Sequence, residues 1–210
     1  MSIFIDTANL KEIEHAMTLG WVFGVTTNPL ILSRENQSAA DQLRAIRDVS
    51  HGPVFYQLMT DDAESMVREA EAAAEILEDR LVLKLSPTTA GFTFAAGHPE
   101  YRTCPTAIFS AAQALVAQEC GAAFIAVYVN RATRLLGDGQ ALVKEIAQTL
   151  LDQPPVILAA SLKTPAEAVA AIRSGADSLT LPANVLAAMM EQKHSAAAVV
   201  EFQEKGIGLN

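Results

Sequence analysis

The feature that most constrains the fold is a repeated alternation of short apolar runs with longer segments of helical period. Short runs rich in branched and aromatic residues, bounded by turn formers, are typical of buried parallel strands. Between them, apolar residues recur three and four positions apart, as in Leu10, Ile13 and Met17 and again over residues 142–151. Eight runs fit the strand pattern: residues 3–6, 23–26, 54–58, 81–85, 106–109, 124–129, 156–159 and 178–180.

This alternation over 210 residues predicts an α/β protein with a single (β/α)8 TIM barrel over residues 1–210. The alternative is an open, doubly wound sheet, but no Gly-x-Gly-x-x-Gly motif follows the first strand. Residues 194–210 predict an extra C-terminal helix, with Ala198, Val199 and Phe202 on one side. This helix would cover a face of the barrel or reach a neighbouring subunit.

Residues 91–106 depart from the repeat, because they hold several turn formers and little helical period. The turn formers are Gly91, Gly97, Pro99 and Pro105. We therefore expect the fourth helix to be short, displaced or replaced by a loop. The segment also holds His98, Tyr101 and Arg102. These side chains could line a pocket, but loop residues usually lie on the surface, and we expect that position for them.

Composition and charge argue against several classes of function. The net charge of −9 argues against nucleic acid as a partner. No apolar run approaches the roughly 20 residues of a membrane span, and residues 1–6 lack the basic start of a signal peptide. The sequence therefore predicts a cytoplasmic protein in which Cys104 and Cys120 are free thiols. The four histidines have no metal-ligand spacing, so a zinc or histidine-based site is not expected.

Lys84 stands near the end of the apolar run 81–85, and Pro87 soon ends the strand. It is the only lysine between Lys11 and Lys144. A buried ammonium loses its hydration, so burial favours a neutral amine, which attacks carbonyl carbon and forms a Schiff base. The alternative is a structural lysine whose amine reaches solvent at the end of the strand.

Polar residues occur at nearly every predicted strand end, where (β/α)8 barrels carry their chemistry. They are Asp6, Thr26, Thr27, Asn28, Gln57, Lys84, Thr106, Tyr128, Asn130, Arg131, Ser161 and Thr180. Each also has a structural explanation, such as a helix cap, a turn or a bond to nearby backbone. Those explanations do not account for the convergence of so many polar residues around one lysine.

This set of side chains meets the needs of Schiff-base aldol chemistry. An amine must add to a ketone, and Lys84 supplies it. Protons must move as water leaves and as the carbon–carbon bond breaks, and Gln57, Thr106 and Tyr128 could together hold one water for that purpose. The histidine and metal routes to the same chemistry are poorly supported, which favours the lysine.

The remaining strand-end residues suit a polar substrate. Asp6, Asn28 and Ser161 are fitted to sugar hydroxyls, and Thr26 stands two residues before Asn28 in the sequence. Arg131 is fitted to an anionic group such as phosphate, because its guanidinium matches phosphate geometry.

Nine segments carry a further signal, because they occur together in a fixed order over nearly the whole chain. They are Phe4-Ile5-Asp6-Thr7, Gly24-Val25-Thr26-Thr27-Asn28-Pro29, Gln57-Leu58-Met59, Leu83-Lys84, Thr106-Ala107, Ala111-Ala112-Gln113, Tyr128-Val129-Asn130-Arg131, Ala159-Ala160-Ser161-Leu162-Lys163-Thr164-Pro165 and Ser178-Leu179-Thr180-Leu181-Pro182. In these segments the chain resembles the small transaldolase family, and more closely its fructose-6-phosphate aldolase branch.

The resemblance implies a barrel, a Schiff base at Lys84, and neither metal nor organic cofactor. It implies that Gln57, Thr106 and Tyr128 position the proton-transferring water. It also implies a sugar phosphate as the substrate, bound at its phosphate by Arg131 and Ser161. Relatives of this type form pentamers and decamers, so a homo-oligomer is expected.

Two positions distinguish the branches of the family. Transaldolases usually carry Glu where Gln57 stands and Phe where Tyr128 stands, so the leading interpretation is a class I aldolase. The alternatives are a transaldolase that transfers a dihydroxyacetone unit, and a non-catalytic barrel that binds sugar phosphates. Lys163 is a rival amine, ranked lower because it stands beside a helix cap. The segment after Lys84 departs from the usual Val-Pro-Val-Thr of the family, which leaves the substrate's anionic group open.

Overall fold

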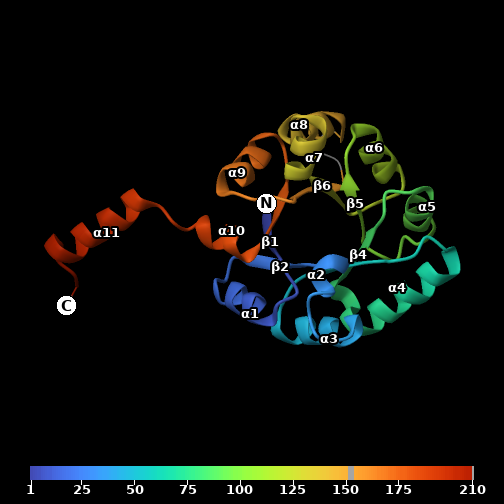
Figure 1. The fold of residues 1–210 in the computed structure, drawn as a ribbon, viewed down its shortest axis with the longest axis horizontal. Helices are drawn as coiled ribbons and strands as arrows, with labels where there is room; N and C mark the ends of the chain where they lie inside the picture. Colours follow the sequence, from blue (N-terminus) through green and yellow to red (C-terminus); the bar gives the residue numbers. More distant parts are fainter. Residues whose placement is uncertain (151–153, 210) are drawn as a thin grey trace.

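The computed structural model describes residues 1–150 and 154–209. Eight parallel strands form a closed barrel in sequence order, which confirms the predicted (β/α)8 architecture (Figure 1). The strands are β1 (Ser2–Asp6), β2 (Val22–Thr26), β3 (Val54–Gln57), β4 (Leu81–Leu85), β5 (Thr103–Ile108), β6 (Phe124–Tyr128), β7 (Val156–Ala160) and β8 (Ser178–Leu181). All the predicted runs except the fifth match their strands to within one residue at each end.

Helices follow the strands and surround the barrel (Figure 1). They are α1 (Leu10–Thr18), α2 (Pro29–Leu32), α3 (Ala39–Val49), α4 (Ala63–Leu77), α5 (Thr89–Gly97), α6 (Ala111–Glu119), α7 (Val129–Leu136), α8 (Gly139–Leu150), α9 (Pro165–Arg173), α10 (Ala183–Ala188) and α11 (Lys193–Lys205), with a short 3-10 helix, η1 (Glu78–Arg80), before β4. The second predicted stripe lies in α8 up to Leu150, and residue 151 falls outside the described residues. Within the described parts of the chain, every helix is too short or too polar to span a bilayer.

Polar side chains fix where most of these helices begin. At each such start, a side-chain oxygen accepts a hydrogen bond from a backbone N–H two or three residues further on, which satisfies a donor that the helix leaves free. The capping residues are Asn9, Asn28, Ser38, Asp62, Thr88, Ser110, Thr164 and Gln192. The loops that carry the strand-end residues are therefore short and anchored at both ends.

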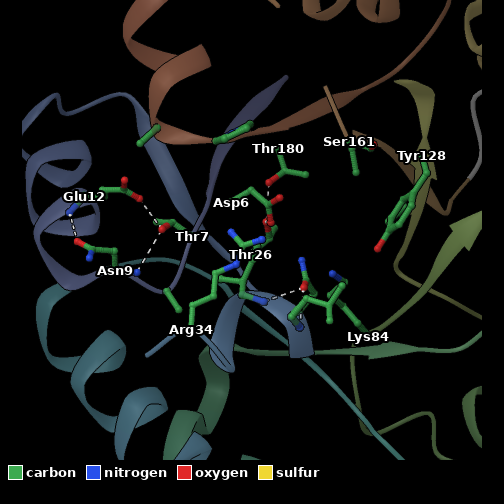
Figure 2. Close-up of a pocket in the computed structure, with 18 of the residues that line it drawn as sticks. Asp6, Thr7, Asn9, Glu12, Thr26, Arg34, Lys84, Tyr128, Ser161 and Thr180 are labelled. Carbon is green, nitrogen blue, oxygen red and sulfur yellow. Dashed lines mark hydrogen bonds between the residues drawn. The ribbon is translucent and has the colours of Figure 1, made fainter. Parts of the chain in front are cut away.

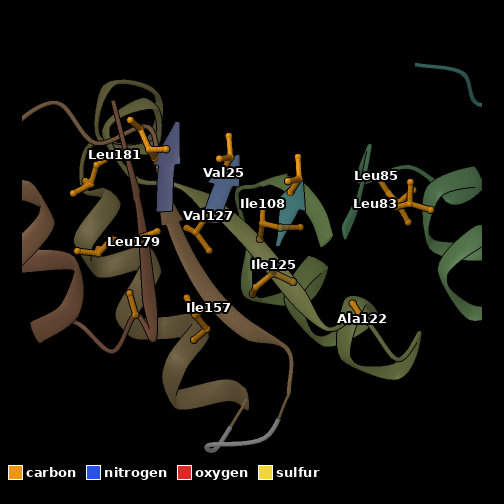
Figure 3. Packing of buried hydrophobic residues seen from close by; sticks show 14 of the residues in the cluster. Val25, Leu83, Leu85, Ile108, Ala122, Ile125, Val127, Ile157, Leu179 and Leu181 are labelled. Atoms are coloured by element: carbon orange, nitrogen blue, oxygen red, sulfur yellow. The ribbon is translucent and has the colours of Figure 1, made fainter. Parts of the chain in front are cut away.

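Alternation along the strands separates two apolar cores. One fills the barrel interior and includes Phe4, Phe55, Val82 and Leu158. The other packs the outward faces of the strands against the helices, as Figure 3 shows. In β4 the odd-numbered leucines belong to the outer core, so Val82 and Lys84 both face the interior. The apolar pattern of β4 thus turns Lys84 into the barrel.

β5 differs from its prediction, because it begins three residues earlier, at Thr103, and includes Pro105. Proline lacks the N–H of the ladder, which is why the sequence favoured a later start. The strand also contains an irregularity: Ala107 has a φ of +56°, and the register shifts between Thr106 and Ile108. The extra residue turns Ile108 toward the outer core while Thr106 remains buried near the interior.

The expectation of an irregular fourth helix was wrong. α5 spans nine residues, as α1, α6 and α9 do, and the Thr88 side chain caps it. Gly91 misled the prediction, because it serves close packing rather than a turn: a Cβ there would overlap the Ser86 carbonyl oxygen. Beyond the helix, the His98 ring stacks on Phe94 with centroids 4.2 Å apart.

We expect Gly91→Ala to destabilise the protein by about 2 kcal/mol, because the methyl group would force α5 away from the loop after β4. Gly97→Ala, at the other end of α5, is the matched control, since nothing lies within 4 Å of its added Cβ. That variant should be neutral or slightly stabilising. Urea unfolding midpoints measure both, and equal midpoints for the two variants would rule out the packing explanation.

α11 confirms the predicted C-terminal helix but does not cover the barrel. It extends away from the other helices, in red in Figure 1. None of its residues is buried, and the Phe202 side chain is 69% exposed. The first of its two predicted placements, on a face of the barrel, is therefore wrong, and contact with a neighbouring subunit stays a prediction.

Candidate active site

The carboxyl ends of the strands surround a cavity of about 620 Å³. Seven of the nine site residues predicted from the sequence line it: Asp6, Thr26, Asn28, Lys84, Tyr128, Arg131 and Ser161. Figure 2 shows the side chains of Asp6, Lys84 and Tyr128 directed into the same space. Three strands from different parts of the barrel, β1, β4 and β6, therefore contribute polar groups to one site.

The Lys84 side chain lies inside the barrel, with the residue only 5% exposed. Its Nζ donates a hydrogen bond of 2.8 Å to the backbone oxygen of Thr27, the residue that follows β2. The amine therefore does not reach bulk solvent. This argues against the alternative of a structural lysine, which required an amine in contact with solvent. A carbonyl compound in the cavity would meet an amine that is held in place and shielded from water.

Cys104 pairs with Lys84 across β4 and β5 and is fully buried inside the barrel. Burial raises the pKa of its thiol to about 12, although the nearby Lys84 acts in the opposite direction. The thiol is therefore protonated at neutral pH and is no rival nucleophile. Cys104 and Cys120 are both free, as the sequence predicted.

Asp6 is held by the hydroxyl group of Thr26 in β2, which in turn contacts Thr180 in β8. Thr26 Oγ1 donates a hydrogen bond of 2.8 Å to Asp6 Oδ1, and it lies 2.5 Å from Thr180 Oγ1. Thr26 and Thr180 are both buried. The Thr26 hydroxyl thus already has partners within the protein. Its position indicates that it orients the Asp6 carboxylate and does not bind a ligand directly.

Asn28 has two duties that the sequence presented as alternatives. Its Oδ1 accepts hydrogen bonds of 3.0 Å from the backbone N–H groups of Leu30 and Ile31, which begins α2. The residue also lines the cavity. Because the cap uses only the carbonyl oxygen, the NH2 group of the side chain stays available for a ligand.

Tyr128 contacts one predicted site residue on each side, Thr106 and Arg131. Thr106 Oγ1 lies 3.4 Å from the Tyr128 hydroxyl, a long hydrogen bond, and Arg131 Cζ lies 4.7 Å from the centre of the Tyr128 ring. A guanidinium over an aromatic face is attracted by the electron-rich ring. Tyr128 and Arg131 line the cavity, and Thr106 does not, although it contacts Tyr128.

Gln57 is the predicted site residue that lies apart from the others. It pairs with Lys84 across β3 and β4. The residue is, however, part of the lining of a neighbouring groove, with Tyr56 and Met59, and not of the main cavity. The proposed grouping of Gln57 with Thr106 and Tyr128 around one water therefore stays a prediction.

Ser161 and Lys163 line the cavity from the loop after β7. Ser161 has a φ of +59°, a left-handed conformation that costs energy for a residue with a side chain. Lys163, the rival amine of the sequence analysis, is exposed, in contrast to Lys84. With Arg131 it makes this end of the cavity basic.

Sequence reasoning missed the cavity residues that stand beyond strand ends. Arg34 follows α2 and points into the cavity (Figure 2), while Glu12 lies in α1. Both are at least six residues past the end of the nearest preceding strand, so the pattern of polar residues at strand ends does not include them. Conversely, His98, Tyr101 and Arg102 lie outside the cavity lining, as expected.

The fold and the site together define a (β/α)8 protein whose cavity, at the carboxyl ends of the strands, encloses a buried lysine among hydroxyl, amide and carboxylate groups. In the described parts of the chain, no three His, Cys, Asp or Glu side chains are placed to hold a metal ion. Residues 3–208 match the family model described as transaldolase/fructose-6-phosphate aldolase. The chain belongs to that family of enzymes.

Relatives of similar length support this assignment. Proteins named probable transaldolase from Caldicellulosiruptor saccharolyticus and Pelotomaculum thermopropionicum are each 34% identical to this chain, covering 96% and 97% of it and 95% and 96% of their own lengths. Another, from Maridesulfovibrio salexigens, is 37% identical over 191 residues, 89% of this chain and 88% of its own.

A solved structure supports the fold alone. Thiamine phosphate pyrophosphorylase from Pyrococcus furiosus superposes with a TM-score of 0.61 over 99% of this chain and 97% of its own. Its sequence identity is only 13%, so the likeness concerns the barrel and carries no argument about chemistry.

Proposed function

We propose that this protein is a class I aldolase that forms or cleaves a carbon–carbon bond between a dihydroxyacetone-type ketone and an aldehyde. The observation that carries the proposal is the buried amine of Lys84 in a cavity shared with Asp6 and Tyr128. An amine kept from solvent is a nucleophile for carbonyl carbon. The cavity is also lined by more polar than apolar side chains, which suits a substrate rich in hydroxyls.

The reaction would proceed through an imine. The Lys84 amine adds to the ketone carbon, and the carbonyl oxygen leaves as water. The carbon–carbon bond then breaks, its electron pair moves into the imine, and the aldehyde departs as its hydroxyl loses a proton to Asp6. The remaining enamine takes a proton at carbon, and water hydrolyses the imine to release the ketone. Tyr128, with Thr106 beside it, would supply the proton that the enamine carbon takes, through a water. The proton held by Asp6 would return through water to Tyr128, which restores both groups.

The basic end of the cavity would hold an anionic group of the substrate. Arg131 and Lys163 line this end together with Ser161. Two cations and a hydroxyl suit phosphate, whose charge at neutral pH is close to −2 and whose oxygens accept several hydrogen bonds. A sugar phosphate would thus lie with its carbonyl carbon at Lys84 and its phosphate beside Arg131.

A transaldolase is the second candidate, favoured by the names of the relatives. It would use the same imine but pass the three-carbon unit to a second sugar instead of releasing it. The assay is incubation with fructose 6-phosphate alone and then with erythrose 4-phosphate. Turnover without the acceptor supports the aldolase, and strict dependence on the acceptor supports the transaldolase.

The imine itself is tested by borohydride reduction in the presence of dihydroxyacetone, followed by mass spectrometry of the peptides. The proposal expects the added mass on the peptide that contains Lys84. Mass added to the Lys163 peptide would transfer the role to that lysine. No added mass on either peptide would favour a barrel that binds sugar phosphates without catalysis.

We also propose a homo-oligomer, a pentamer or decamer as the resemblance implies, in which α11 contacts a neighbouring subunit. Phe202→Asp should reduce the mass in solution, because it places a charge among the apolar side chains of α11. Ala197→Asp, on the opposite face of the helix, is the control. Light scattering measures both, and an unchanged mass for Phe202→Asp would argue against this role of α11.

A further inference from the structure

The carboxylate of Glu167 joins two walls of the cavity that are far apart in the sequence. Its Oε1 accepts a hydrogen bond of 2.7 Å from Asn130 Nδ2, in the first turn of α7. Its Oε2 accepts one of 2.7 Å from the backbone N–H of Lys163, in the loop after β7. Both oxygens are thus bonded, one to each wall.

These contacts differ from those of an ordinary helix start. Glu167 is the third residue of α9, and the Thr164 side chain caps the helix by accepting from the Glu167 N–H at 3.1 Å. In a capping box the glutamate would reach back to the N–H of the capping threonine. Here it passes over Thr164 and reaches Lys163 and Asn130 instead. The helix cap therefore does not explain the tie to α7.

We infer that Glu167 is a positioning residue that fixes the two sides of the anion-binding end relative to each other. Asn130 is next to Arg131 in α7, and Lys163 is two residues from Ser161. By joining Asn130 to Lys163, the carboxylate sets the spacing between Arg131 and Ser161. This inference rests on the proposed binding of a phosphate by those residues, and it assigns Glu167 the selectivity for phosphorylated over unphosphorylated substrates.

Glu167 does not pair with the cations of the site. Among the residues that the structure describes, neither Arg131 nor Lys163 forms an ion pair with it, because its oxygens are taken by uncharged N–H donors. Both cations therefore stay available for the substrate. Glu167 itself is half-buried, so the two hydrogen bonds are partly shielded from competition by water.

Glu167→Ala separates this role from simple electrostatics, because the two explanations predict opposite changes in the affinity for phosphate. Removing a negative charge near an anion site should tighten phosphate binding if only charge mattered. The positioning role predicts weaker binding: the Kd for inorganic phosphate should rise about tenfold, the size of one lost charge-assisted contact. Titration calorimetry on the full chain measures it. Binding as tight as, or tighter than, that of the wild type overturns the inference.

Two further variants test the hydrogen bonds of Glu167 to Asn130 and Lys163. Asn130→Ala removes the bond to α7 without changing the charge or the cap of α9, and it should weaken phosphate binding by a similar factor. Glu167→Gln should retain binding within about threefold, because a glutamine can still accept from Lys163 and the Asn130 amide can turn to accept in its place. Should Glu167→Ala fail to fold, unchanged binding in Asn130→Ala would by itself overturn the inference.

The control is Glu64→Ala, which removes a carboxylate from the first turn of α4, outside the cavity. The second measurement is the ratio of kcat/KM for fructose 6-phosphate to that for fructose, which should fall in Glu167→Ala and not in the control. Phosphate binding does not need the Lys84 imine. Failure of borohydride trapping would thus reject the proposed function, while an unchanged phosphate Kd would reject only the role of Glu167.

Discussion

Replacing Lys84 by methionine should abolish turnover and leave the barrel folded. The change keeps most of the side-chain volume inside the barrel and removes only the amine, so no large cavity forms. We expect kcat to fall by about 10⁴-fold or more, as is typical when a covalent nucleophile is lost. Steady-state cleavage of fructose 6-phosphate measures the loss.

Lys84→Met should also be at least as stable as the wild type, because burial of an amine costs hydration that a methionine does not require. Thr27 loses its donor in this variant, which offsets part of the gain. Lys163→Met is the matched control, since this lysine lines the same cavity but is exposed. It should weaken binding of phosphorylated substrates and leave the borohydride adduct intact. Residual turnover near the wild-type level in Lys84→Met would end the Schiff-base proposal.

Tyr128→Phe should change the product of the reaction. Without the phenol, protonation of the enamine slows, and the three-carbon unit stays bound long enough to meet a second aldehyde. We expect cleavage of fructose 6-phosphate alone to fall about 100-fold, the usual scale of a lost proton donor, while transfer to erythrose 4-phosphate falls much less. The measurement is the ratio of free dihydroxyacetone to transferred product.

Tyr56→Phe is the control for that experiment. Tyr56 is adjacent to Gln57 in β3, but its hydroxyl donates to Glu69 at 2.7 Å, away from the cavity. Burial, and then the contact with Glu69, raise the pKa of the Tyr56 phenol, so its loss removes a structural hydrogen bond and no titrating group. The product ratio should not change in this variant. An equal shift in both variants would mean that the effect is one of stability.

The periodicity of the chain was enough to predict a parallel sheet covered by helices, because an apolar run buried on both faces suits a strand of such a sheet. The number of repeats, and the absence of a Gly-x-Gly-x-x-Gly motif after the first strand, favoured a closed barrel over an open sheet. The errors occurred where a residue served a purpose other than its usual one. Gly91 allows close packing of α5 instead of ending a helix, and Pro105 lies within β5. Single-residue propensities carry no information about such tertiary contacts.

The residues of the site also divide into those that the sequence predicted and those that it did not. Polar residues at strand ends were predictable, since the end of a strand is visible in the sequence and all parallel strands of a barrel end on one side. Arg34 and Glu12 were not, because they come from a turn and a helix that reach the cavity only when the chain is folded. Gln57 pairs with Lys84 across β3 and β4 but is absent from the cavity lining, so its role in the site stays a prediction.

The sequence by itself determined the barrel, the inward direction of Lys84 and the ring of polar residues around it, because strand periodicity is local and sets which side chains face inward. Only the tertiary structure decided how those residues are joined: Thr26 to both Asp6 and Thr180, Thr106 to Tyr128, and Glu167 to Asn130. These contacts link residues on different strands and helices, and their distances depend on how the whole barrel closes.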